Sequence, residues 1–333
     1  MMEHSFASYI QILGKGRRGA RDLTQNEARE AMTLVLSGAV EPVQLGAFLM
    51  LMRVKEETPA EVAGFVQAAR AALPKPPNLM SVDLDWSSYA GKRRQLPWHV
   101  LAALLLASHG SKVLVHGVDS GTAGRVYMPQ ALAALGLTPA RSSAEAAQQL
   151  ARHHFAYLPL EAFNPVLQSM LDLKSVLGLR SPVHTLVRML NPFAAQASLI
   201  GIFHPGYDET HQQAAALMGD AGLAVFKGEG GEPERNPDGS CSVRLLREGR
   251  MLTQEWPALF ERRHLRDEVL DCNRLRRLWR DEDDDEYGTA AVISTAAIAL
   301  TAQGRASDPE QAMLQAAHLW HIRNRHFLES IAY

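Results

Sequence analysis

Residues 58–84 read TPAEVAGFVQAARAALPKPPNLMSVDL, and the change of pattern within them decides the fold. Thr58 and Glu61 form a capping box, with Pro59 at the first helical position, and this combination begins helices. The apolar residues that follow have the spacing of one helix face: Val62, Phe65, Val66 and Ala69. The run Pro74-Lys75-Pro76-Pro77 ends the helix, because proline stops helices and favours extended chain. We therefore place a domain boundary between residues 75 and 76.

The segment before this boundary predicts a small helical domain over residues 1–75. Thr24 and Glu27 form another capping box, ahead of a helix that Gly38 is expected to end. The next helix is expected to begin near Pro42 and to place four apolar residues on one side: Leu45, Phe48, Leu49 and Met52. Apolar helical segments at about 163–192 could join this domain or the one that follows.

The segment after the boundary, residues 76–333, alternates short strands with helices. The candidate strands are Val82–Leu84, Val113–His116, Phe155–Leu158, Leu199–Phe203 and Leu223–Phe226. Helical stretches separate them, for example 98–108, 127–135 and 208–218. Such alternation predicts a mostly parallel central sheet with helices on its faces. The fold class is α/β in a two-domain (α+β) arrangement, with a small N-terminal helical bundle and a larger α/β domain.

Composition restricts the class of protein further. The chain has 333 residues, a hydrophobic fraction of 47% and a formal net charge of −2, so nucleic-acid binding would need a local basic patch. Cys241 and Cys272 form no CxxC pair, which argues against a disulfide framework and fits a reduced, cytoplasmic setting. No apolar run approaches the roughly 18 residues that span a bilayer, so we expect no membrane partner.

Basic side chains cluster at three places. The first cluster precedes the first capped helix, the second follows the first strand, and the third lies on a predicted C-terminal helix: Lys15, Arg17, Arg18 and Arg21; Lys92, Arg93 and Arg94; and Arg262, Arg263, Arg266, Arg274, Arg276, Arg277 and Arg280. The second cluster is interpreted either as a solvated turn or as an anion-binding loop. Interleaved acidic residues favour a salt-bridged helix face for the third cluster.

The loop expected at 85–95 bears on phosphate chemistry, because ligands of α/β sheets bind at the carboxyl ends of strands. A loop that wraps pyrophosphate with backbone N–H groups needs several glycines, and this one has only Gly91. Its three consecutive cations would instead suit a polyanion bound at several points. Trp86, Tyr89 and Trp98 flank them and are candidates for stacking unpaired bases, with packing between loop and helix as the alternative.

Several motifs in the range 10–240 resemble the anthranilate phosphoribosyltransferases of glycosyltransferase family 3. The resemblance rests on Asp22-Leu23-Thr24, Gln44 to Met50, Arg53 to Gly64, His116-Gly117, Leu177 to Ser181, Asn191-Pro192 and His204-Pro205. It implies a phosphoribosyltransferase- and nucleoside-phosphorylase-like fold, and a homodimer formed through the helical domain. Isolated histidines such as His116, His184 and His204 are interpreted as structural residues, and no catalytic residue is assigned.

The chain departs from this family in the motifs that carry the reaction. Trp86-Ser87-Ser88-Tyr89-Ala90 stands where the family has its GTGGD phosphate loop, and Val115-His116-Gly117-Val118-Asp119 stands where it has KHGNR. Lys174, near Arg180, aligns with the arginine that contacts anthranilate. Pro233-Glu234, beside Glu232, aligns with the acidic pair that holds magnesium. The combined changes indicate that the reaction is lost and that no cofactor is needed.

The pattern also resembles the YbiB-like side branch of the same superfamily, which shows a KRRQ-type stretch in place of the glycine loop. That resemblance implies a homodimer that binds nucleic acid, DNA or also RNA, without strong sequence preference. The candidate anion-binding residues are Lys15, Arg17, Arg18, Arg21, Lys92, Arg93, Arg94, Lys174 and Arg180. Two alternatives stay open. One is a phosphoribosyltransferase with a rebuilt anion site, in which Glu232 and Glu234 would be weak candidates for magnesium. The other is a regulatory or scaffolding dimer.

Overall fold

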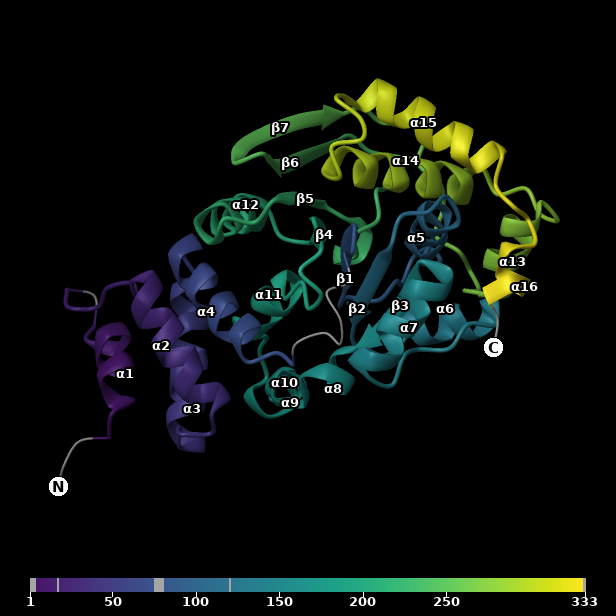
Figure 1. The fold of residues 1–333 in the computed structure, drawn as a ribbon. Coiled ribbons are helices and arrows are strands. Elements are labelled where there is room, and N and C mark those ends of the chain that lie inside the picture. The colour runs from purple at the N-terminus through teal and green to yellow at the C-terminus, as the bar shows by residue number, and fades with distance from the viewer. Residues whose placement is uncertain (1–3, 17, 75–80, 120, 332–333) are drawn as a thin grey trace.

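The computed structural model describes residues 4–16, 18–74, 81–119 and 121–331. Its N-terminal part is the helical bundle at the purple end of Figure 1, built from α1 (Ala7–Gly14), α2 (Gln25–Leu36), α3 (Pro42–Lys55) and α4 (Pro59–Ala71). Both predicted capping boxes are present, since Thr24 caps α2 with Glu27 and Thr58 caps α4 with Glu61. The predicted boundary at 75 and 76 lies outside the described residues.

A seven-stranded sheet forms the centre of the larger part, in the order β3-β2-β1-β4-β5-β6-β7. The strands β1 (Leu84–Ser88), β2 (Val113–Gly117), β3 (Phe155–Pro159), β4 (Ala197–Ile202) and β5 (Gly222–Lys227) run parallel. The antiparallel hairpin β6 (Cys241–Arg247) and β7 (Arg250–Trp256) extends it at one edge. Its two-residue turn holds Glu248 and Gly249 at φ values of 51° and 73°, as a type I′ connection requires. This hairpin was not among the strands predicted from the sequence.

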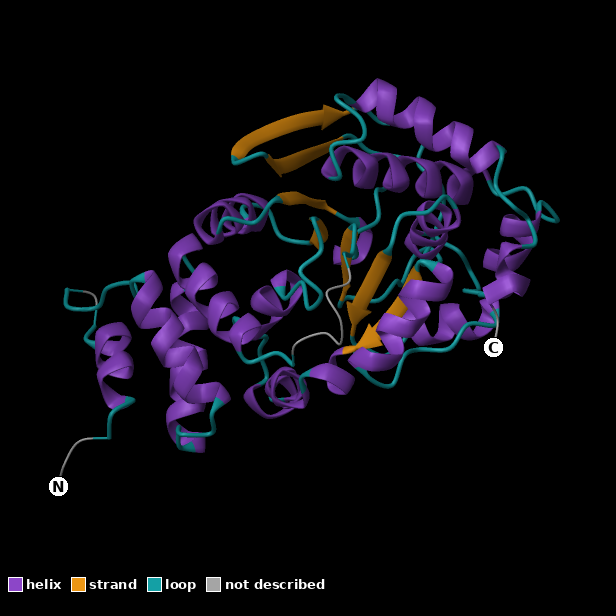
Figure 2. Ribbon diagram, viewed as in Figure 1, coloured by secondary structure: helices purple, strands orange, loops and turns teal. Residues whose placement is uncertain are grey.

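Helices cover both faces of the sheet (Figure 2). Their bounds are α5 (His99–Ser108), α6 (Met128–Leu135), α7 (Ser143–His153), α8 (Leu160–Phe163), α9 (Pro165–Asp172), α10 (Lys174–Leu177), α11 (Val183–Leu186), α12 (Tyr207–Met218), α13 (Asn273–Arg280), α14 (Glu286–Ala302), α15 (Pro309–His321) and α16 (Phe327–Ile331). Short 3₁₀ turns, η1 (Val187–Met189) and η2 (Glu229–Gly231), precede β4 and follow β5. The predicted α/β fold class with its mostly parallel sheet is confirmed.

Each face of the sheet has its own apolar core. Residues such as Leu84, Trp86 and Val115 point toward α5, α6, α13 and α14 on one side. Residues such as Leu114 and Ile200 point to the other side, where their core is continuous with that of α2 and α4. The Arg70 side chain of α4 adds polar links, donating to Met189 O at 2.7 Å and pairing with Asp220 at 2.5 Å. The bundle and the sheet are therefore fixed to one another by shared packing.

The first strand lies further along the chain than predicted. The expected strand Val82–Leu84 overlaps β1 at Leu84 alone, and β1 continues from there to Ser88. Trp86 consequently lies inside the sheet rather than in a loop, because the alternation of a strand directs its side chain into the core. In the described part of the chain, no helix combines the length and the apolar character needed to cross a membrane.

Candidate functional site

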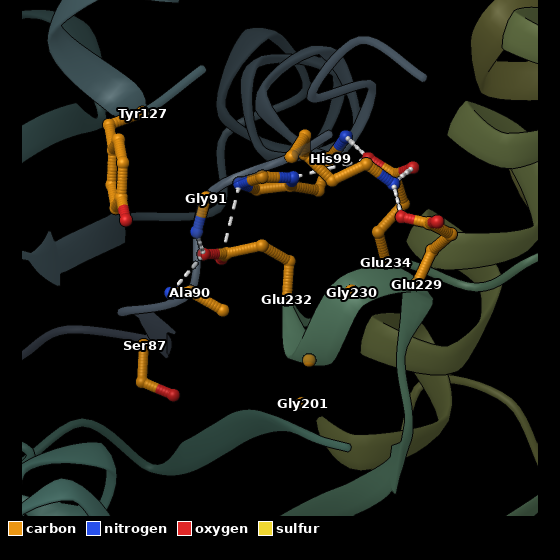
Figure 3. A network of polar contacts seen from close by, with 12 residues as sticks. Ser87, Ala90, Gly91, His99, Tyr127, Gly201, Glu229, Gly230, Glu232 and Glu234 are labelled. Carbon is orange, nitrogen blue, oxygen red and sulfur yellow. Dashed lines mark hydrogen bonds and ion pairs between the residues drawn. The ribbon is translucent and has the colours of Figure 1, made fainter. Parts of the chain in front are cut away.

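The strand order reverses between β1 and β4, and ligands of such sheets bind outside the carboxyl ends of the strands at this point. The chain leaves β1 through Tyr89, Ala90 and Gly91, and it leaves β4 at Ile202. The segment that follows β5, residues 228–234, crosses between these two exits and places three glutamates there: Glu229, Glu232 and Glu234. Figure 3 shows the polar network that results.

Glu232 fills the amide pair that follows β1. Its Oε1 accepts hydrogen bonds from the backbone N–H groups of Ala90 and Gly91, each at 2.5 Å, and its side chain is fully buried (Figure 3). Adjacent N–H groups of this kind are what a protein offers to a phosphate. Here the anion that they bind belongs to the chain itself.

Lys92 is the cation of the same network. Its ammonium group contacts Glu234 and lies 2.8 Å from Glu229, and the lysine side chain is fully buried. Burial alone would lower the pKa of Lys92, but Glu234 and Glu229 raise it above the ordinary value. Lys92 is therefore charged and unavailable to a ligand. The expectation of three mobile cations is wrong for this residue, because it points inward to neutralise buried carboxylates.

Glu234 is held by two further groups at the start of α5. The His99 backbone N–H donates to its Oε2 at 2.8 Å, and His99 Nδ1 lies 3.2 Å from the same oxygen. Burial would raise the pKa of this carboxyl group, but Lys92 and His99 together lower it. Glu234 is thus ionised at neutral pH, and its two oxygens are taken by protein donors.

Magnesium is the cofactor that the family resemblance implies, and this donor set does not fit it. Glu232 uses Oε1 to accept from two amides, and the Lys92 ammonium stands between Glu229 and Glu234. A divalent ion would need carboxylate oxygens that face an open volume. In the described part of the chain, no group of three or more His, Cys, Asp or Glu side chains is arranged to hold a metal ion.

The aromatic candidates are buried more deeply than expected. Trp86 and Trp98 are both 0% exposed, so the expectation that they stack on bases is wrong. Trp86 lies in the middle of β1, and Trp98 packs against Gly288 of α14, where a Cβ would meet its ring at 2.9 Å. Tyr89 is half-buried, and its hydroxyl lies 2.7 Å from His116 Nδ1. Of the three, only Tyr89 lines a cavity.

The N-terminal basic cluster is only partly available to a ligand. Arg21 binds Glu27 with both terminal nitrogens, at 2.8 Å and 2.7 Å, and so supports the capping box of α2. Lys15 and Arg18 are exposed, and within the described residues neither forms an ion pair. Arg17 lies outside the described residues.

The C-terminal basic cluster divides into two groups. Three of the four arginines of α13 are paired: Arg274 with Asp267 and Asp285, Arg277 with Asp271 and Asp283, and Arg280 with Glu282 and Glu329. Arg276, the fourth, forms no ion pair within the described residues. Arg262, Arg263 and Arg266 are exposed, form no ion pair within the described part of the chain, and lie in a loop rather than on the predicted helix. The salt-bridged face therefore describes α13 alone.

Backbone contacts bring this loop beside Arg93 and Arg94. The Asp267 N–H donates to Arg94 O at 2.8 Å, and the Gln95 side chain donates to Leu265 O at 2.7 Å. Two distant segments that carry exposed arginines thus meet here. We call these arginines the outer arginine patch: Arg93, Arg94, Arg262, Arg263 and Arg266. Part of it borders a cavity of about 410 Å³.

Lys174 and Arg180 lie elsewhere, in the cleft between the bundle and the sheet. Both are exposed and line a cavity of about 320 Å³ together with Tyr89 and Arg188. Arg188, which the sequence analysis missed, donates to Gly201 O at 2.9 Å and to Gly231 O at 3.0 Å. Arg125, also missed, donates to Ala90 O at 2.8 Å. Neither arginine stands in a basic run, so the sequence carried no local signal for them.

Comparison with known proteins agrees with this architecture. Residues 8–73 match the helical bundle domain of a glycosyl transferase family. The Escherichia coli (strain K12) protein YbiB is 31% identical over 255 residues, which are 75% of this chain and 79% of that protein. The anthranilate phosphoribosyltransferase of Oleidesulfovibrio alaskensis is 31% identical over 233 residues, which are 68% of this chain and 69% of that enzyme.

Solved structures share the fold at lower identity. Anthranilate phosphoribosyltransferase from Thermus thermophilus superposes with a TM-score of 0.78 at 22% identity, covering 98% of this chain and 99% of that one. The enzyme from Saccharomyces cerevisiae, in complex with PRPP and Mg, superposes with a TM-score of 0.78 at 16% identity. The superposition covers 98% of this chain and 97% of that one. The fold is thus of the phosphoribosyltransferase class. The chain belongs to the glycosyltransferase family 3 superfamily that includes the anthranilate phosphoribosyltransferases and YbiB.

Proposed function

We propose that this protein binds nucleic acid, DNA and also RNA, through backbone phosphates at the outer arginine patch, and that it has lost phosphoribosyl transfer. One observation carries the proposal: Glu232 and Lys92 occupy, from within the chain, the positions of the anion and of the cation at the β1 exit. A binding protein can keep this fold while the site of the reaction is closed.

The geometry of that network supports the proposed loss of the reaction. A diphosphate would have to displace the Glu232 carboxylate from the amides of Ala90 and Gly91. The displaced carboxylate is fully buried and would keep its charge only with a new partner. Transfer of a phosphoribosyl group depends on a positioned leaving group with stabilised charge, and this network provides no open place for one.

Nucleic-acid binding is supported by the unpaired charge of the outer arginine patch. Its five arginines are exposed and have no ion pair in the described part of the chain, in contrast to the paired arginines of α13. Arginine binds phosphate oxygens with a planar fork of donors, and such contacts need no base. We therefore expect affinity without strong sequence preference.

We also propose that the protein is a homodimer, joined through the helical bundle, that acts in the cytoplasm. Val43 and Val54 of α3 are 78% and 83% exposed, and an interface on this helix would cover them. A two-fold dimer duplicates the outer arginine patch and so raises avidity for a long strand. Light scattering measures the mass, and replacement of Val54 by Asp is expected to yield monomers.

The salt dependence of binding tests the nucleic-acid proposal. Replacing all five arginines of the outer arginine patch by alanine should reduce the slope of log K against log salt by up to about 4.5 for duplex DNA, since each phosphate contact contributes about 0.9. The matched control replaces Arg277, Arg280 and Arg325, which are ion-paired, and should leave the slope unchanged. Equal slopes for the parent and the five-residue variant would refute the proposal.

Family membership favours one second candidate, a phosphoribosyltransferase with an altered site. That enzyme would bind phosphoribosyl pyrophosphate saturably in the presence of magnesium. Calorimetry at millimolar ligand separates the two candidates, because the filled network predicts no heat of binding that depends on magnesium. A saturable isotherm that vanishes in the absence of magnesium would favour the enzyme.

A further inference from the structure

Two adjacent chambers lie in the cleft between the bundle and the sheet. The outer chamber, of about 320 Å³, has Tyr89, Tyr127 and Lys174 among its lining residues. The inner chamber, of about 90 Å³, has Arg53, Tyr207 and His211 among its lining residues. Arg180, His184 and Arg188 line both chambers, so a ligand with one group in each chamber would contact these three residues.

The inner chamber has an excess of positive charge. Arg53, Arg180 and Arg188 line it, and none of them forms an ion pair within the described residues. Burial lowers the pKa of Arg180, and the charges of Arg125 and Arg53 lower it further. Burial also lowers the pKa of Arg188, where the charge of Arg180 adds to the effect and that of Glu232 opposes it. Like charges held together in a partly buried space are costly unless an anion joins them. The arrangement therefore favours a ligand with negative charge.

The other titratable groups of the inner chamber do not cancel this charge. Burial lowers the pKa of His184 to about 4 and that of His211 to about 4, so both imidazoles are neutral at pH 7. Glu57 is the acidic residue of the lining, and burial raises its pKa while its carboxylate accepts from the Tyr207 hydroxyl at 3.3 Å. Three arginines against one carboxyl group leave a net positive chamber.

The outer chamber has a different character. Tyr89, Val118, Tyr127 and Leu171 give it apolar and aromatic walls, and Lys174, Gln168 and Thr122 add polar groups at its sides. Its volume lies at the small end of the range for small-molecule pockets. It therefore suits a single planar, partly polar group, and tyrosine faces can stack on a nucleobase.

We propose that this cleft binds a phosphate monoester of a nucleoside. The phosphate lies in the inner chamber against Arg53, Arg180 and Arg188, and the nucleoside lies in the outer chamber beside Tyr89. Arginine forks suit the oxygens of a terminal phosphate, which carries more charge than a phosphodiester. A free nucleotide and the 5′-phosphate end of a strand share this chemistry, and only the strand-end form rests on the proposed function.

Calorimetry with adenosine monophosphate, adenosine and inorganic phosphate tests the site directly. We expect the nucleotide to bind at least about tenfold more tightly than adenosine, because the charged hydrogen bonds to arginine are lost with the phosphate. Inorganic phosphate should compete for the same site more weakly. Equal affinity for the nucleotide and for adenosine, or no binding of either, would overturn the proposal.

Variants locate the site. Replacing Arg53 and Arg180 by alanine should weaken nucleotide binding by about tenfold or more, and the milder pair Arg53→Lys and Arg180→Lys should give a smaller loss, because lysine keeps the charge without the fork. The lysine variant is the control for a folding defect in the alanine variant. Retention of full nucleotide affinity by the alanine variant, with its melting temperature unchanged, would contradict the assignment.

Oligonucleotides with and without a 5′-phosphate distinguish the two sources of the ligand. A strand-end site predicts tighter binding of the phosphorylated strand, and this difference should disappear in the Arg53/Arg180 variant. Replacing Arg93 and Arg94 should weaken both strands alike and leave nucleotide binding unchanged. If the Arg93/Arg94 variant loses strand binding and the parent protein binds no nucleotide, the cleft proposal fails and the proposed function stands. If the parent protein binds nucleotide but no strand, the proposed function fails and the cleft proposal stands.

Discussion

Lys92, Arg93 and Arg94 are adjacent cations, but their surroundings in the folded protein are opposite. Lys92 is 0% exposed and paired with two buried glutamates, whereas both arginines are exposed and unpaired within the described part of the chain. The difference comes from the backbone at 90–92, which places Lys92 over the carboxylates of the 228–234 segment and turns the arginines outward. The basic triplet therefore consists of two features: one cation that neutralises buried carboxylates and two cations that stay exposed.

The largest effect is expected from removing the buried charge. Lys92→Met should lower the free energy of unfolding by about 3–5 kcal/mol, because Glu234 and Glu229 would stay buried without their cation. Arg93→Met is the matched control and should change it by less than about 0.5 kcal/mol. Urea denaturation measures both values, and equal values for the two variants would remove the distinction between them.

A smaller effect is expected where the filled site is held by close packing. Gly201 of β4 lies under the Glu232 backbone, where an added Cβ would come within 2.2 Å of the Glu232 carbonyl carbon. Gly201→Ala should cost about 1–3 kcal/mol of unfolding free energy, as overpacking does. Gly46→Ala in α3, with nothing within 4 Å of the new Cβ, should instead stabilise by up to about 1 kcal/mol. Thermal melts measure both effects. If both substitutions raise the melting temperature, the backbone around Gly201 accommodates the added Cβ without strain, and the prediction is wrong.

Exposed arginines should contribute differently to the salt dependence of DNA binding, according to whether they are ion-paired. Arg94→Ala removes an unpaired cation and should reduce the salt slope of duplex binding by about 0.9, which corresponds to roughly 1 kcal/mol near physiological salt. Arg277→Ala removes a cation held by Asp271 and Asp283 and should leave the slope as it is. Filter binding over a salt series gives both slopes. A larger change for Arg277 than for Arg94 would reverse our assignment of the patch.

The smallest effect concerns a pair at the surface, Arg21 and Glu27. The hydrogen bond to Arg21 lowers the pKa of Glu27 from 4.5 to about 2. Because the folded pKa is depressed, the stabilisation is present above pH 4.5 and is lost as the pH falls toward 2. Glu27→Gln should therefore cost less than about 1 kcal/mol at neutral pH, since the pair is exposed, and nothing near pH 2. Unfolding at both pH values checks this, and a pH-independent difference would contradict it.

Local patterns predicted much of the fold. The capping boxes at Thr24 and Thr58 and the strand at Val113 were correct, because they depend on neighbours within a few residues. The hairpin at 241–256 was missed, although its alternating residues and the Glu248-Gly249 turn were signals for it. The position of β1 was shifted, and that shift led to the wrong expectation for Trp86.

The candidate site was less accessible from sequence. Lys174 and Arg180 were expected as anion-binding residues, and the structure places them in the wall of a cleft. Arg53 and Arg188 join Arg180 around the inner chamber, although about 130 residues of chain separate the first from the others. No window of the sequence contains that cluster, because it forms only where the bundle meets the sheet.

The sequence by itself determined the two-part architecture, the helix starts and the absence of a glycine-rich loop after β1, since each depends on local backbone preference. Only the tertiary structure decided which charges are neutralised. Glu232 reaches the Ala90 and Gly91 amides across about 140 residues of chain, and Lys92 reaches Glu234 across a similar span. A charge is paired or free according to what lies within a few ångströms of it, and chain folding, not sequence proximity, sets that neighbourhood.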